Sequence, residues 1–179
     1  ETGERSPSLE RSLRIARYKS GKYTIERPLH LGASLAIADS NERKELITTL
    51  SAYGLPLGEA FQLRDDLLGI FGDPEITGKP AGDDIREGKR TVLMAMTLER
   101  ADSKSSAKIS AALGRDDLSQ DDISEIRGLI SATGAVKDVE DLIDSLLSNA
   151  LTAANSAVIE PSARGLLIEL ATSATRRSH

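Results

Sequence analysis

The stretch FQLRDDLLGIF, residues 61–71, combines the apolar pattern of a buried helix with two adjacent carboxylates. On a helix, Gln62 lies three and four positions before Asp65 and Asp66, so all three side chains can face one direction. Adjacent carboxylates repel each other unless a cation lies between them, and hard divalent cations such as Mg²⁺ take oxygen ligands. An isolated Asp-Asp pair is most often a solvated acidic surface. The apolar residues around this pair argue against that interpretation here.

The composition predicts an all-α protein. Hydrophobic residues make up 39 % of the chain and aromatic residues only 3 %, so the core must consist mainly of Leu, Ile and Ala. Such a core favours packed helices over a β-sandwich. Apolar residues recur at helical spacing, most clearly at Val139, Leu142, Ile143, Leu146, Leu147 and Leu151. We therefore expect a single all-helical domain over residues 1–179.

Turn and cap residues divide the sequence into helices. Ser6-Pro7 is typical of a helix start, and we expect a first helix to about residue 37 with a kink at Pro28. Ser40-Asn41 can cap a second helix over residues 42–72, which Gly-Leu-Pro at 54–56 should kink or break. Glycines, prolines and charges predict a flexible loop over residues 73–89. Further helices are expected at about residues 91–101, 105–113, 119–134, 135–157 and 162–176, with Asp122 at the acidic end of a capping box.

Three lysines are candidates for binding an anion. Lys79 and Lys89 lie ten residues apart in the loop, beside glycines whose exposed N–H groups can also point at a diphosphate. Lys19 lies in the first helix next to the hydroxyl of Ser20. Each lysine taken alone would be an ordinary surface residue, so the argument rests on their combination with the aspartate pair.

Other classes of function are excluded or disfavoured by the composition. A formal charge of −5 without a basic stripe argues against nucleic-acid binding. The absence of cysteine removes disulfides and thiolate metal sites, and two histidines make a zinc site improbable. No apolar run approaches the roughly 20 residues of a membrane span, so we expect a cytoplasmic protein. The start at Glu1-Thr2-Gly3 without Met suggests a processed or truncated product.

Together these segments resemble a known family. The run from Phe61 to Leu68, followed by Gly72-Asp73-Pro74, Thr77-Gly78-Lys79, Gly82–Asp84 and Gly88-Lys89-Arg90-Thr91, is similar to the second aspartate-rich region of trans-isoprenyl diphosphate synthases. Upstream, Lys19-Ser20-Gly21 through Pro28-Leu29 resembles the Lys-Thr-(Gly/Ala) helix of the same family. The resemblance covers about residues 15–95 and keeps the order and spacing of the motifs.

The resemblance implies an isoprenoid-synthase-type bundle of long helices, of which only the C-terminal helices are present, usually as a homodimer. It implies a prenyltransferase that condenses an allylic diphosphate with isopentenyl diphosphate, here to a short-chain product of the geranylgeranyl or farnesyl type. Asp65 and Asp66 would hold Mg²⁺, with Mn²⁺ as an alternative. The catalytic residues would be Lys19, Gln62 and Lys79. The substrate diphosphate would be bound by Lys19, Ser20, Gln62, Lys79 and Lys89.

Two departures from the family pattern matter. The second motif usually has a third Asp four residues after the first, and this chain has Gly69 there. Asp73, one turn further, is not expected to substitute. The first aspartate-rich motif and the basic residues for isopentenyl diphosphate would lie N-terminal to this sequence, so we expect the chain to be inactive alone.

Two other functions stay open. A terpene cyclase shares the implied fold and metal chemistry, although its second motif spaces Asn/Asp, Ser/Thr and Glu differently from residues 58–75. A non-catalytic helical partner subunit of a prenyl synthase would often have lost the acidic and basic residues that this chain keeps.

Overall fold

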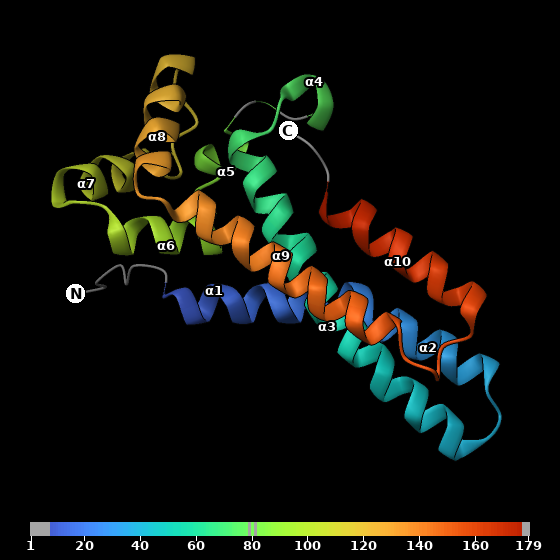
Figure 1. Ribbon diagram of the computed structural model, residues 1–179. Coiled ribbons are helices and arrows are strands. Elements are labelled where there is room, and N and C mark those ends of the chain that lie inside the picture. The colour runs from blue at the N-terminus through green and yellow to red at the C-terminus, as the bar shows by residue number, and fades with distance from the viewer. Residues whose placement is uncertain (1–7, 79, 81, 177–179) are drawn as a thin grey trace. The chain divides into compact units, whose positions relative to one another are not determined.

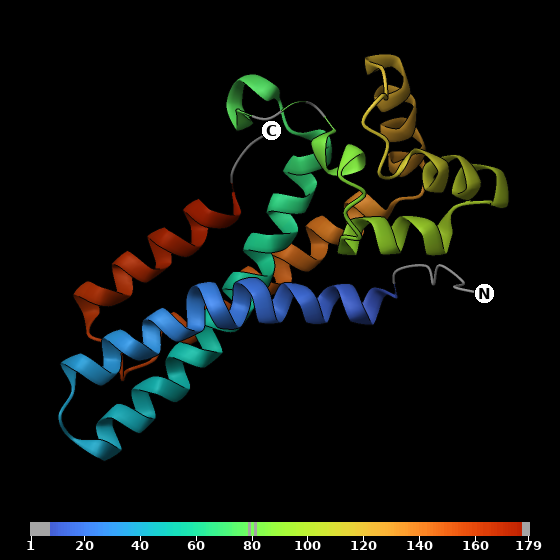
Figure 2. The same ribbon diagram turned by 180° about the vertical axis from the view of Figure 1, so that it is seen from behind.

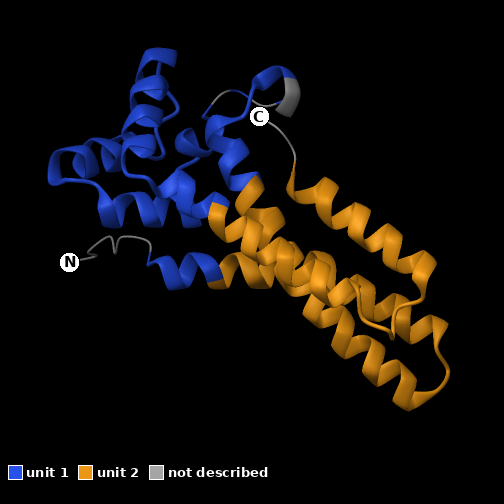
Figure 3. Ribbon diagram, viewed as in Figure 1, with its two compact units in different colours: residues 1–13, 65–140, 179 blue, residues 14–64, 141–178 orange. Residues whose placement is uncertain are grey.

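The computed structural model describes residues 8–78, 80 and 82–176, and all secondary structure within this part of the chain is helical (Figure 1). No helix among these residues is both long and apolar enough to cross a membrane. The chain divides into two compact units (Figure 3). As far as they are described, residues 1–13 and 65–140 form unit 1, and residues 14–64 and 141–178 form unit 2.

The first helical stretch changes its hydrogen-bond pattern twice. It runs as α1 (Leu9–Ala16), the π-helical segment η1 (Arg17–Glu26) and α2 (Arg27–Ala36). The N–H of Arg27 bonds to the carbonyl of Lys22, five residues earlier. Pro28 explains where this wider pattern lies, because proline lacks an N–H and its ring presses on the carbonyl four residues before it. The predicted start at Ser6-Pro7 lies outside the described residues.

The second long helix, α3 (Ser40–Phe71), is continuous, so of the kink or break expected at residues 54–56 the break does not occur. Pro56 lies inside the helix, between Tyr53 and Leu57, which are both completely buried. Burial of this face compensates for the hydrogen bond that proline removes. The cap also differs from the prediction, since the Asp39 carboxylate accepts from the N–H groups of residues 41 and 42 at 2.9 Å each.

Two glycines bring η1 against α3 within unit 2. A methyl group added at Gly58 would lie 2.5 Å from Gly21 Cα and 2.5 Å from the Ser20 carbonyl oxygen. A methyl group at Gly54 would lie 3.2 Å from Glu26 Cα. The two helix backbones are therefore in direct contact, at a separation that only glycine permits.

The rest of unit 2 packs on the same part of α3. Tyr53 and Leu57 form a buried cluster with Leu147, Ala150 and Ala154 of α9 (Ala135–Ala154) and Ala171 of α10 (Pro161–Thr175). The Tyr53 hydroxyl donates to the Leu167 carbonyl at 2.8 Å. Burial raises the pKa of Tyr53 to about 12, so the phenol stays protonated and keeps this bond. Figure 2 shows α2, the first half of α3 and α10 from behind.

Unit 1 contains the short helices α4 (Pro74–Thr77) and α5 (Asp83–Arg86), followed by α6 (Val92–Arg100), α7 (Ser103–Ala112) and α8 (Gln120–Ala132). The predicted capping box is confirmed: Ser119 and Asp122 exchange side-chain to backbone hydrogen bonds at the start of α8. Arg127 of α8 donates to the Ile70 carbonyl at 2.5 Å. This cation satisfies a carbonyl at the C-terminal end of α3, immediately before the loop of residues 73–89.

The backbone contact between η1 and α3 predicts opposite effects for two Gly→Ala substitutions. Gly58→Ala should lower the free energy of unfolding by about 1–3 kcal/mol, because the methyl group meets backbone that cannot move aside. Gly165→Ala in α10 is the control, since nothing lies within 4 Å of its position. This variant should gain about 0.5–1 kcal/mol, because alanine loses less entropy in a helix. Equal changes in urea unfolding would contradict the contact.

Candidate functional site

Ser20 and Gln62 form the part of the candidate site that lies in unit 2. The Ser20 hydroxyl donates to Gln62 Oε1 at 2.6 Å, and both side chains are buried. The pair joins η1 to α3 one turn beyond the Gly21–Gly58 contact, so the glycines fix the distance that this bond needs. Both residues were predicted to bond a diphosphate, and the structure shows them bonded to each other. Lys19, next to Ser20, has an exposed side chain.

Asp65 and Asp66 follow Gln62 by one turn along α3, at the start of unit 1. Asp66 is 6 % exposed and Asp65 is half-buried. The pair is therefore not the solvated acidic surface that an isolated Asp-Asp would suggest. Immediately before the pair, Arg64 Nε donates to the Thr175 carbonyl at 2.8 Å, which ties this turn of α3 to the end of α10 within unit 2.

The space at Gly69, where the family's third Asp was expected, is filled by Asp84 from α5. A methyl group at Gly69 would lie 2.2 Å from Asp84 Oδ2 and 2.3 Å from its carboxyl carbon. Asp84 is 4 % exposed. Sequence reasoning did not select Asp84 as a site residue, although the gap at Gly69 and the Asp five residues before Lys89 were both visible.

Lys89 lies against this carboxylate. Its ammonium group is 2.5 Å from Asp84 Oδ1 and 2.8 Å from a carboxylate oxygen of Glu87. Partial burial alone would lower the pKa of Lys89, but the hydrogen bonds to Asp84 and Glu87 outweigh burial and raise it. Lys89 therefore carries a fixed positive charge within unit 1. Lys79, the other loop lysine, lies outside the described residues.

The carboxylates of Asp65 and Asp66 suit a hard divalent cation that takes its remaining ligands from a substrate and water. Among the described residues, no group of three or more His, Cys, Asp or Glu side chains could hold a metal by itself. Mg²⁺ commonly binds one or two carboxylates together with substrate phosphates and water, and Asp65 and Asp66 can supply the carboxylates. Asp73 is exposed, and it caps α4 by accepting from the Glu75 N–H at 2.9 Å. Asp73 thus acts as a helix cap in this structure, and its failure to replace the missing motif residue stays a prediction.

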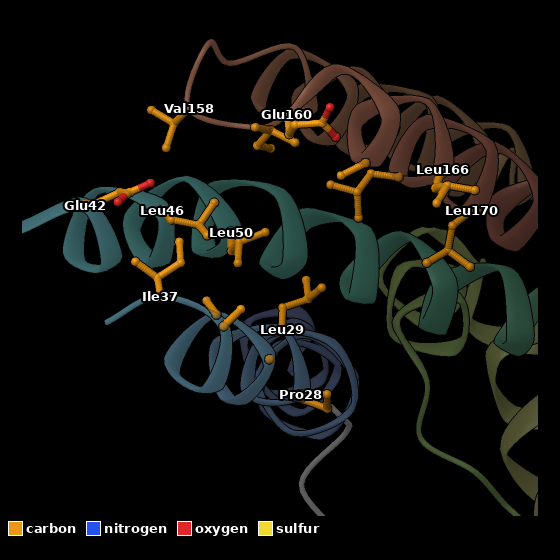
Figure 4. Close-up of a pocket in the computed structure, with 16 residues that line it drawn as sticks. Pro28, Leu29, Ile37, Glu42, Leu46, Leu50, Val158, Glu160, Leu166 and Leu170 are labelled. Atoms are coloured by element: carbon orange, nitrogen blue, oxygen red, sulfur yellow. The ribbon is translucent and has the colours of Figure 1, made fainter. Parts of the chain in front are cut away.

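A concave feature of unit 2 lies between α2, the first half of α3 and α10 (Figure 4). It has a volume of about 570 Å³. Its lining is apolar apart from the carboxylates of Glu42 and Glu160, and it contains no Lys or Arg. Leu50, on its wall, lies about 18 Å along α3 from Gln62 at 1.5 Å per residue. The pocket lacks the cations that a diphosphate requires.

The Ser20–Gln62 bond predicts a stability cost that depends on burial. Ser20→Ala should lower the free energy of unfolding by about 1–3 kcal/mol, because Gln62 Oε1 loses a buried donor. Thr24→Ala is a control in the same segment, since the exposed Thr24 hydroxyl donates to the Lys19 carbonyl. It should stay within about 0.5 kcal/mol of the native protein. Similar losses for both variants in denaturant titrations would argue against a structural role for the bond.

Comparison with known proteins places this chain. The short chain isoprenyl diphosphate synthase of Methanocaldococcus jannaschii is 33 % identical over 119 residues, which are 66 % of this chain and 35 % of that protein. The (2E,6E)-farnesyl diphosphate synthase of Mycobacterium tuberculosis is 35 % identical over 130 residues, 71 % of this chain and 35 % of that protein. The chain thus spans about a third of the length of these curated relatives.

Solved structures agree over almost the whole chain. The geranylgeranyl pyrophosphate synthase of Corynebacterium glutamicum, complexed with isoprenyl diphosphate and magnesium, is 47 % identical with a TM-score of 0.89. That match covers 96 % of this chain and 48 % of the other. The geranylgeranyl pyrophosphate synthetase of Pyrococcus horikoshii is 27 % identical with a TM-score of 0.82, and the match covers 96 % and 50 % of the two chains. These matches confirm the predicted all-α fold, and they cover about half the length of each of these synthases.

The family model for polyprenyl synthetase matches residues 1–130, which include every motif that carried the resemblance. The chain therefore belongs to the polyprenyl synthetase family.

Proposed function

We propose that this chain is the part of a short-chain prenyl diphosphate synthase that holds the diphosphate of the allylic substrate and promotes its departure. The observation that carries the proposal is the Asp65–Asp66 pair on α3, followed in unit 1 by the fixed positive charge of Lys89. The similar Corynebacterium glutamicum structure, which is complexed with isoprenyl diphosphate and magnesium, supports this choice of ligand.

The chemistry of the proposed reaction explains the residue types. An allylic diphosphate ionises when the C–O bond breaks, and the diphosphate leaves with the electron pair. Preplaced cations stabilise the negative charge that develops on the leaving oxygen. Lys19, Lys79 and Lys89 would supply this positive charge. Asp65 and Asp66 would hold Mg²⁺, which adds further positive charge at the diphosphate when bound.

Ser20 and Gln62 take a more defined role than direct diphosphate binding. Their mutual hydrogen bond fixes the turn of η1 that carries Lys19, the residue next to Ser20. We propose that the pair fixes the backbone position from which the Lys19 side chain reaches the diphosphate. Water must be kept from the allylic carbocation until isopentenyl diphosphate attacks it. The full synthase would act as a homodimer and make a product of the geranylgeranyl or farnesyl type.

The role of Asp65 can be tested in the full-length protein. Asp65→Asn keeps the shape of the side chain and removes the charge, so kcat for prenyl transfer should fall roughly 10²–10³-fold. Asp73→Asn is the matched control, because asparagine caps a helix as well as aspartate does. The assay uses isopentenyl diphosphate, an allylic diphosphate and Mg²⁺. The 179-residue chain alone, assayed in parallel, should give no elongated product. A larger loss for Asp73→Asn would place the metal elsewhere.

The segment over residues 73–89 is proposed to order around the substrate. Its described part contains two one-turn helices separated by glycines with left-handed backbone, such as Gly78 and Gly82. Backbone hydrogen bonds already hold residues 82–89, for example from the Glu87 N–H to the Asp83 carbonyl, so the change on binding is expected mainly before Gly82. Binding of a diphosphate to its lysines should slow amide exchange in peptides from residues 73–89 of the full-length protein. Hydrogen exchange with and without a non-hydrolysable allylic diphosphate plus Mg²⁺ measures this. Unchanged exchange would contradict the substrate-binding role given to Lys79.

A further inference from the structure

The close fit between Gly69 and Asp84 links a gap in the aspartate motif to a loop residue. Gly69 lies four residues after Asp65, so it occupies the next turn on the same side of α3. A methyl group there would overlap the Asp84 carboxylate, with 2.2 Å to Oδ2 and 2.7 Å to Oδ1. The carboxylate of Asp84 therefore lies where a side chain at position 69 would begin. The Asp84 carboxylate and a side chain at position 69 cannot both occupy this space.

Asp84 is held in that place by three features of unit 1. It is 96 % buried, as its exposed fraction of 4 % shows, and it belongs to the one-turn helix α5. Its own carbonyl accepts from the Lys89 N–H at 3.0 Å, which closes the turn between the two residues. Its side chain accepts from the Lys89 ammonium at 2.5 Å. The backbone bond and the ion pair together fix where Lys89 can place its charge.

We propose that Asp84 is a positioning residue for Lys89, and that Gly69 is required because it leaves the room that the Asp84 carboxylate occupies. In this chain the acidic group one turn after the Asp65–Asp66 pair is thus Asp84 from the loop, and its carboxylate is paired with the Lys89 ammonium. The proposal rests on the proposed function, since Lys89 is taken to face the diphosphate.

The pairing of Asp84 with Lys89 changes the charge that this turn offers to the diphosphate. An Asp side chain on α3 at position 69 would add a negative group that has no cation of its own. The Asp84 carboxylate is already paired with Lys89, so the position of the Lys89 ammonium is set before substrate binds. A preplaced cation stabilises a leaving diphosphate without reorganising during the reaction.

The first test measures the fit by thermal unfolding of the full-length protein. Gly69→Ala should lower Tm by roughly 2–10 °C, the range expected for overpacking. Gly128→Ala in α8 is the matched control in the same unit, with nothing within 4 Å, and should raise Tm by about 1–4 °C. In an Asp84→Ala background, Gly69→Ala should no longer lower Tm. A loss of the same size in both backgrounds would overturn the role given to Gly69.

The second test asks whether Asp84 acts through Lys89. Asp84→Asn keeps the size of the side chain, so it should fold, and it should lower kcat roughly 10–100-fold, as loss of a supporting group typically does. Lys89→Met should lower kcat at least as much. The double variant should be no worse than Lys89→Met, and the Mg²⁺ concentration that gives half-maximal rate should not change. An additional loss in the double variant, or a raised Mg²⁺ requirement, would show that Asp84 acts on the metal itself and overturn the proposal.

Asp65→Asn, measured beside these variants, distinguishes a failure of the positioning role from a failure of the proposed function. Full turnover in Lys89→Met with loss in Asp65→Asn would overturn the positioning role and the role given to Lys89, and would leave the metal-binding role of Asp65 intact. Full turnover in both variants would overturn the proposed function as well. Loss in both, with no further loss on adding Asp84→Asn to Lys89→Met, is the result that the proposal predicts.

Discussion

The direct backbone contact between Gly21 of η1 and Gly58 of α3 is the constraint on which the rest of unit 2 depends. A side chain at position 58 would meet main-chain atoms at 2.5 Å, so the two helices can approach this closely only with glycine. The approach brings the Ser20 hydroxyl to 2.6 Å from the Gln62 amide oxygen. It also explains how α3 passes through Pro56 unbroken, because packing on this face outweighs the lost hydrogen bond.

The same device recurs further along α3 within unit 1. At Gly69 the missing side chain admits a carboxylate from α5, just as at Gly58 it admits a neighbouring backbone. Helix interiors usually disfavour glycine by about 1 kcal/mol relative to alanine. At these two positions glycine is explained by what lies against the helix. Gly128 and Gly165, which have nothing within 4 Å, need no such explanation and serve as controls.

The sequence predicted the features that local chemistry decides. The helical fold followed from apolar spacing, and the capping box of Ser119 and Asp122 followed from residues three apart. The continuity of α3 did not, since it depends on burial of Tyr53 and Leu57 against segments distant in sequence. The π-helical form of η1 was also missed, because the expected kink at Pro28 says nothing about the hydrogen-bond pattern before it.

The candidate site divides in the same way. The aspartates and lysines could be selected from motif spacing, since their residue types suit a metal and a diphosphate. The Ser20–Gln62 pairing and the position of Asp84 could not, because each joins residues 42 or 15 apart along the chain through tertiary packing. Gly69 looked like a loss in the metal motif. The structure shows that the Asp84 carboxylate, which comes from α5, occupies the space beside Gly69.

The central claim is that α3 and the loop after it hold the diphosphate of an allylic substrate through Asp65 and Lys89. A crystal structure of the full-length protein with Mg²⁺ and a non-hydrolysable allylic diphosphate tests it most directly. The account predicts Mg²⁺ ligated by the Asp65 carboxylate, and the Lys89 ammonium within hydrogen-bond distance of both the diphosphate and Asp84. A diphosphate bound with Asp65 away from the metal and Lys89 turned to solvent would contradict it.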